Sequence, residues 1–283
     1  MIRLCVFTLV LSFLVSSSGF AQLETPRPSP FGKLEQTVGI MKVSIEYSRP
    51  GVKGRKVFGD LVPYGQVWRT GANSPTLITF SDDVMVDGKA VPAGKYSLYT
   101  IPGEKEWTFI LNKKVTGGAQ LDEKEDQLRI KATPKPTGGL VETMTFNVAG
   151  ITNNSATVEL AWENTAVGFG IAFDVDSKVM AQIDEVMKEP FADVAGTYYQ
   201  SASYYYNNGK DLKKALDWVI RSLDLDPEPY FVWRLKSQVQ AGLKDYDGAI
   251  VSAKTAIEKG EKANNPDFVK LNQTSIAEWE KMK

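Results

Sequence analysis

The segment Ile78–Ile101, ITFSDDVMVDGKAVPAGKYSLYTI, decides the fold class of the first part of this chain. The Asp87-Gly88 pair marks a β-hairpin within it, because these residues readily adopt the backbone conformations of a two-residue turn. After the hairpin, Tyr96 and Leu98 alternate with polar neighbours, which is the period of a half-buried strand. The segment therefore predicts antiparallel strands joined by short turns.

The same alternation extends outward in both directions, from Lys33 to about Phe173. Frequent turn residues divide it into about nine short runs, a pattern typical of an antiparallel sandwich or barrel. We therefore predict a β-sandwich domain over residues 33–174. Residues 22–32, rich in proline and polar side chains, are expected to form a leader or linker.

The first 21 residues are typical of a secretory signal peptide. Arg3 supplies a positive charge, an apolar core runs from Leu4 to Val15, and small residues at Gly19 and Ala21 fit cleavage after residue 21. The apolar run is shorter than the about 20 residues that a membrane-spanning helix needs. We expect a periplasmic or secreted protein with no membrane span after cleavage.

The composition excludes several kinds of chemistry. The chain has no histidine, and its single cysteine, Cys5, lies within the predicted signal peptide. Catalysis by Ser-His-Asp or Cys-His groups and histidine-bound metal sites are therefore impossible. The formal net charge of −1 shows no electrostatic footprint for nucleic acid. We expect no cofactor, no metal and no nucleic-acid partner.

Beyond Phe173 the apolar period changes to that of a helix. Val175, Val179 and Ile183 predict a linking helix over residues 175–190, ending at Pro190. Residues 191–283 are expected to be helical throughout. The predicted fold class is therefore α+β and multidomain: an antiparallel β-sandwich followed by an array of helical hairpins.

The predicted helical part contains an internal repeat. Lys210–Leu216 matches Lys244–Ile250, and the two alanines Ala215 and Ala249 lie 34 positions apart, which is 249 − 215. A helix–turn–helix pattern with this period is that of the tetratricopeptide repeat. A tetratricopeptide array normally needs at least three repeats to be stable alone, and this chain shows two. We therefore expect these helices either to bind a protein partner or to cap the sandwich.

The loop Ser48–Asn73, SRPGVKGRKVFGDLVPYGQVWRTGAN, interrupts the regular strand pattern. It carries five cations against one acid, with aromatic residues set among glycines. Arginine forks suit anionic groups, and aromatic rings suit sugars or peptides. The candidate residues for an anionic or glycan ligand are Arg49, Arg55, Tyr64, Trp68, Arg69 and Asn73. In the alternative, the loop only closes one end of the sandwich, and Trp68 and Arg69 are buried.

A third hypothesis is a carbohydrate-active hydrolase that uses two carboxylates. The sandwich region offers acids at Asp82, Asp83, Asp87, Glu104 and Glu106 and in the run 122–126. A Ser-x-x-Lys site is not recognisable, and no catalytic residue is assigned. The separation of the carboxylates in the fold is what distinguishes this hypothesis from a binding role.

The stretches GRKVFGDLVPYGQVWRTGAN (54–73), residues 78–113 and LAWENTAV (160–167) resemble the bacterial secreted family called domain of unknown function 2911. The resemblance covers about residues 31–174. It implies a bacterial envelope setting and supplies no catalytic residue, since the family has no established activity. We expect an exported, non-enzymatic binding or protein-interaction module of the cell envelope. The alternatives are the hydrolase and a purely structural envelope protein.

Overall fold

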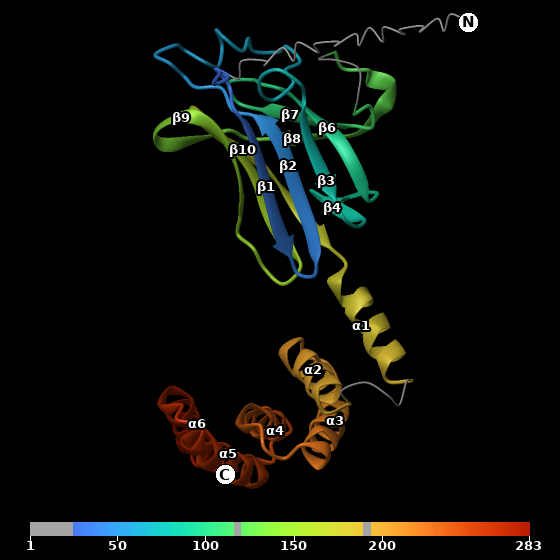
Figure 1. Ribbon diagram of the computed structural model, residues 1–283, viewed down its shortest axis with the longest axis vertical. Coiled ribbons are helices and arrows are strands. Elements are labelled where there is room, and N and C mark those ends of the chain that lie inside the picture. Colours follow the sequence, from blue (N-terminus) through green and yellow to red (C-terminus); the bar gives the residue numbers. More distant parts are fainter. Residues whose placement is uncertain (1–24, 116–119, 189–193) are drawn as a thin grey trace, which may run out of the picture. The chain divides into compact units, whose positions relative to one another are not determined.

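The computed structural model describes residues 25–115, 120–188 and 194–283. In these residues ten strands precede six α-helices, which confirms the predicted α+β class (Figure 1). The chain divides after Val175 into two compact units. The predicted signal peptide lies outside the described residues.

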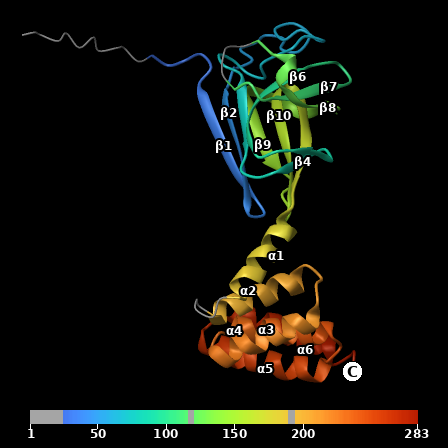
Figure 2. The same ribbon diagram turned by 90° about the vertical axis from the view of Figure 1, so that its right-hand side faces the viewer.

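The first unit consists of two antiparallel sheets (Figure 2). The larger sheet has the strand order β1-β2-β3-β6-β7-β8, and the smaller has the order β5-β4-β10-β9. The ten strands are β1 (Phe31–Val38), β2 (Met41–Ser48), β3 (Thr76–Phe80), β4 (Val84–Val86), β5 (Lys89–Val91), β6 (Gly94–Ile101), β7 (Trp107–Asn112), β8 (Asp126–Ala132), β9 (Lys135–Ala149) and β10 (Ser155–Phe173). Strand β1 begins two residues before the expected domain start at Lys33.

The hairpin predicted at the Asp87-Gly88 pair is confirmed. Strands β4 and β5 pair in antiparallel register from Val84 with Val91 to Val86 with Lys89. Asp87 and Gly88 have φ angles of 44° and 77°. Both lie in the left-handed region that this type of two-residue turn requires.

Strand β10 is one strand of 19 residues. Its pairing with β9 shifts on both sides of Glu163, whose φ angle is 55°. Before this bulge the even-numbered residues up to Trp162 are buried, and after it the odd-numbered residues from Val167 are buried. The left-handed backbone at Glu163 coincides with this change in alternation, and both halves of the strand face the same core.

The core of the first unit lies between the two sheets. Phe109 on β7 and Phe169 on β10 meet edge to face, with ring centroids 5.0 Å apart. Trp107 and Trp162 are each 1% exposed. Burial of each such side chain contributes about 1.5–3 kcal/mol, so this aromatic core accounts for much of the stability of a unit without disulfides.

The second unit is helical. Its helices are α1 (Val175–Val186), α2 (Val194–Asn207), α3 (Leu212–Leu225), α4 (Tyr230–Gly242), α5 (Tyr246–Lys262) and α6 (Pro266–Trp279). None of the helices within the described ranges is both long and apolar enough to cross a membrane.

The second unit repeats a helical hairpin at the predicted spacing. Asp211 and Asp245, 34 positions apart, cap the N-termini of α3 and α5 by accepting hydrogen bonds from backbone N–H groups. Ala215 and Ala249 are fully buried. Membership in the tetratricopeptide class stays a prediction.

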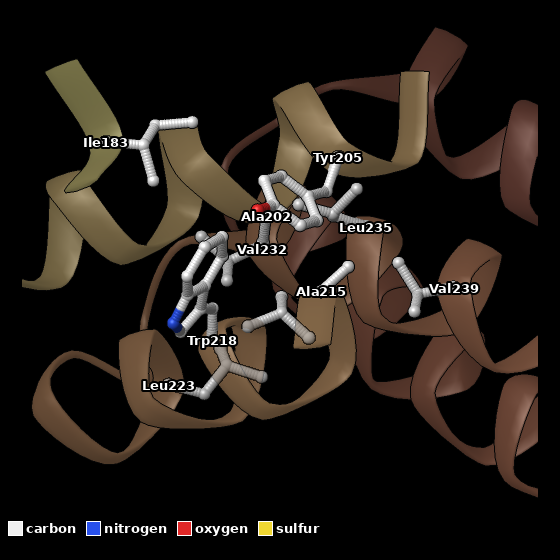
Figure 3. Close-up of a cluster of buried hydrophobic side chains, with 10 residues drawn as sticks. Ile183, Ala202, Tyr205, Ala215, Trp218, Leu223, Val232, Leu235 and Val239 are labelled. Carbon is white, nitrogen blue, oxygen red and sulfur yellow. The ribbon is translucent and has the colours of Figure 1, made fainter. Parts of the chain in front are cut away.

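The core of the helical unit gathers side chains from α1 to α4 (Figure 3). Tyr205 on α2 and Trp218 on α3 meet edge to face at 4.8 Å. Ile183 on α1 belongs to the same cluster, and Lys210 pairs with Asp176 near the start of α1 at 2.7 Å. The linking helix therefore packs on the helical unit.

Candidate functional site

The loop Ser48–Asn73 connects β2 to β3 and joins both sheets of the sandwich. Its isolated bridges pair Gly51 with Thr143 on β9 and Trp68 with Thr100 on β6. Trp68 and Thr100 exchange two backbone hydrogen bonds, of 2.7 and 2.9 Å. The loop is thus fixed at both ends to strands that are distant in sequence.

Two of the candidate arginines donate hydrogen bonds to neutral acceptors of the protein itself. Arg49 donates from Nε to the Met144 carbonyl at 3.0 Å and from Nη2 to Thr145 Oγ1 at 2.8 Å. Arg55 donates to the carbonyls of Val52 and Gly51 at 3.0 and 2.7 Å. These forks hold the loop to β9 and close its own turn.

The aromatic side chains of the loop enter the core. Trp68 stacks on Trp162 at 5.8 Å with an interplanar angle of 20°. Phe58, which is 4% exposed, lies 4.8 Å from Trp107, 6.0 Å from Trp162 and 6.1 Å from Trp68. We call these four rings the aromatic plug. Tyr64 lies outside it and is 38% exposed.

The remaining candidates differ from one another. Asn73 donates to Ser48 Oγ at 3.0 Å, and Trp68 Nε1 donates to the Gly71 carbonyl at 3.1 Å. Arg69 is half-buried, and its Nε has no hydrogen-bond partner in the part of the chain that the structure describes. Taken together, the contacts of this loop favour the alternative in which it closes one end of the sandwich.

Three of the acids considered for hydrolysis serve turns or an ion pair. Asp83 accepts from the Ala93 backbone N–H and Asp87 from that of Gly170, both at 2.8 Å. Glu106 pairs with Lys131 at 2.6 Å. Over the described ranges, no group of three or more histidine, cysteine or acidic side chains is placed to hold a metal ion.

The helical unit carries a second candidate surface that sequence reasoning missed. Tyr199 on α2 lies 5.0 Å from Phe231 on α4, and Tyr230 on α4 lies 4.5 Å from Phe268 on α6. Tyr230 and Phe231 are themselves 5.7 Å apart. We call this set of four rings, which crosses three alternate helices, the aromatic row.

The aromatic row is partly open to solvent. Phe231 is 42% exposed, and the other three rings are half-buried. Burial raises the pKa of the Tyr199 phenol, so this ring stays neutral and mainly apolar at physiological pH. The sequence feature that could have indicated the aromatic row is the density of aromatic residues in 198–206 and 230–233.

Arg234 lies beside the aromatic row on α4. Its guanidinium is 5.8 Å from the Phe268 ring, and Nη1 donates to Asn272 Oδ1 at 3.2 Å. Asn272 is fully buried and donates from Nδ2 to the Phe268 carbonyl at 2.8 Å. Burial lowers the pKa of Arg234, and the nearby Tyr206 opposes this shift. The arginine is thus held in one orientation at a half-buried position.

In the described chain, two antiparallel sheets closed by an aromatic loop precede a unit of helical hairpins. The chain belongs to the family described as protein of unknown function (DUF2911), whose profile matches residues 29–171. This match confirms the resemblance noted in the loop and strand motifs.

The other comparisons add little. No curated protein matches the chain. The solution structure of protein BPP2914 from Bordetella parapertussis is similar to it at 15% identity, over 36% of this chain and 87% of that one, with a TM-score of 0.33. A likeness at this level carries no argument about function.

Proposed function

We propose that this protein is a non-enzymatic protein-interaction module of the bacterial cell envelope and that the helical unit contains its binding surface. The aromatic row carries the proposal. Aromatic rings that remain partly exposed supply a large apolar contact area at low entropic cost, which makes them frequent anchors at interfaces. The row spans α2, α4 and α6, so a partner can contact several helices at once.

The sandwich has a supporting role in this proposal. Arg49 of its loop donates to strand β9, and Arg55 and Asn73 donate to acceptors within the loop itself. Of the candidate acids, Asp83 and Asp87 hold turns and Glu106 pairs with a lysine. We therefore place recognition on the helical unit, and we assign the loop to closing the sandwich.

The test is selection of binding peptides from a random displayed library by the full mature chain, followed by measurement of Kd for the selected peptides. Phe231→Ala removes the most exposed ring of the row. It should weaken binding at least about tenfold, as expected for loss of one aromatic anchor. Val251→Ala is the matched control, because Val251 on α5 is exposed and outside the row.

Selection of no peptides, or equal weakening by Phe231→Ala and Val251→Ala, would show that the aromatic row is not the binding surface. Circular dichroism of each variant must match that of the parent chain. The row lies at the surface, so Phe231→Ala should leave the fold intact.

A further inference from the structure

The Arg234 guanidinium has hydrogen-bonding capacity that the protein does not use. A guanidinium carries five N–H donors. Among the described residues, the Arg234 guanidinium has one hydrogen-bond acceptor, Asn272 Oδ1, to which its Nη1 donates. Asn272 is buried on α6, where its side chain donates to the Phe268 carbonyl of the same helix. The contact with Asn272 therefore fixes the orientation of the guanidinium without neutralising its charge.

Two other half-buried cations of the same unit each have a carboxylate partner. Lys210 pairs with Asp176 at 2.7 Å, and Lys259 pairs with Glu228 at 3.1 Å. Arg234 has no carboxylate within ion-pair distance among residues of the described ranges, although burial already weakens its hydration. A half-buried, orientated guanidinium without a carboxylate of its own offers its free N–H groups to an anion from a binding partner.

We propose that the partner is a peptide segment with a carboxylate, from an aspartate, a glutamate or a chain end, which pairs with Arg234 while an apolar neighbour packs on Phe231. Arginine forks bind carboxylates through two parallel hydrogen bonds, which fixes the orientation of the bound group. The exposed Leu271, next to Asn272, adds apolar surface. This inference rests on the proposed function and names the chemistry of its partner.

The experiment compares acidic content among peptides selected from a random displayed library by three forms of the full mature chain. Peptides selected by the parent chain should be enriched in acids beside apolar residues, or should require a free C-terminal carboxylate. Arg234→Gln should abolish this preference. Arg221→Gln is the matched control, because Arg221 on α3 also lies over a ring, 5.9 Å from that of Tyr198, but is exposed.

A second measurement does not depend on the folding of a variant. The best selected peptide is synthesised with its acid and with the matching amide, and Kd is measured by fluorescence anisotropy. Charge-assisted hydrogen bonds are worth about 1.5–3 kcal/mol, so the amide should bind the parent chain at least about tenfold more weakly. Against Arg234→Gln, acid and amide should bind equally.

The outcomes separate this inference from the proposed function. Peptides that depend on Phe231 but show no preference for acids, or whose preference survives Arg234→Gln, overturn the carboxylate assignment and leave the interaction surface standing. Failure to select any peptide overturns both. Equal loss of the acid preference in Arg221→Gln also overturns the assignment, because it points to general positive charge.

Discussion

Replacement of Phe58 by alanine tests whether the Ser48–Asn73 loop is a structural part of the sandwich. Phe58 is 4% exposed and contacts three tryptophan rings edge to face. Loss of the buried ring removes about 2 kcal/mol of transfer free energy, and each lost ring contact adds about 0.5–1 kcal/mol. The expected destabilisation is about 4 kcal/mol, within the range of about 3–5 kcal/mol for such substitutions.

The assay is urea unfolding of the mature chain, followed by the near-ultraviolet circular dichroism of the stacked Trp68 and Trp162. Trp107 adds to this signal from the sandwich unit, and Trp218, Trp233 and Trp279 add to it from the helical unit, so the loss is read from the transition that Phe58→Ala shifts. Tyr64→Ala is the control, because Tyr64 belongs to the same loop but is partly exposed, and it should cost less than about 1 kcal/mol. A loss below about 1.5 kcal/mol for Phe58→Ala, or an equal loss for both variants, would refute the structural role of the loop.

Three further predictions concern other parts of the chain. Asp245→Ala removes the N-cap of α5 and should lower the stability of the helical unit by about 1 kcal/mol in thermal unfolding, whereas an unchanged Tm would contradict the capping role. Hydrogen bonds from Lys210 and then Tyr204 lower the pKa of Asp176, so this contribution to stability is present above the ordinary aspartate pKa and is lost as pH falls through the folded value. Asp176→Asn should therefore reduce the acid sensitivity of unfolding, and an identical pH profile would exclude that contribution. Alkaline phosphatase fused after residue 32 should be exported with a mature N-terminus at Gln22, and retention of the uncleaved fusion in the cytoplasm would count against the signal peptide.

The parts of the fold that local residues determine were predictable from the sequence. The Asp87-Gly88 turn requires left-handed backbone angles, and these residue types reveal that requirement directly. The 34-residue offset between Asp211 and Asp245 likewise follows from repeated local patterns. The family assignment came from contiguous motifs, so it too could be made without a structure.

Features that depend on distant pairing were not predictable. The register shifts between β9 and β10 around Glu163 depend on how two long strands pair, and nothing in the local residues marks them. Arg49 finds its acceptors 95 and 96 positions away, on β9. A cationic loop therefore suggested a ligand site, although Arg49 and Arg55 donate to acceptors of the protein itself. The orientation of Arg234 could not be predicted for the same reason, since its acceptor Asn272 lies 38 positions further along the chain.

The continuity of β10 has a mechanical consequence. This strand lies inside its sheet, between β4 and β9, and ends at Phe173, two residues before α1 begins. Tension on the helical tail therefore reaches the sandwich along the axis of an interior strand. Its hydrogen bonds to both neighbours would be loaded together in shear and would resist as a group. A partner that pulls on the tail should unfold helices before it extracts this strand.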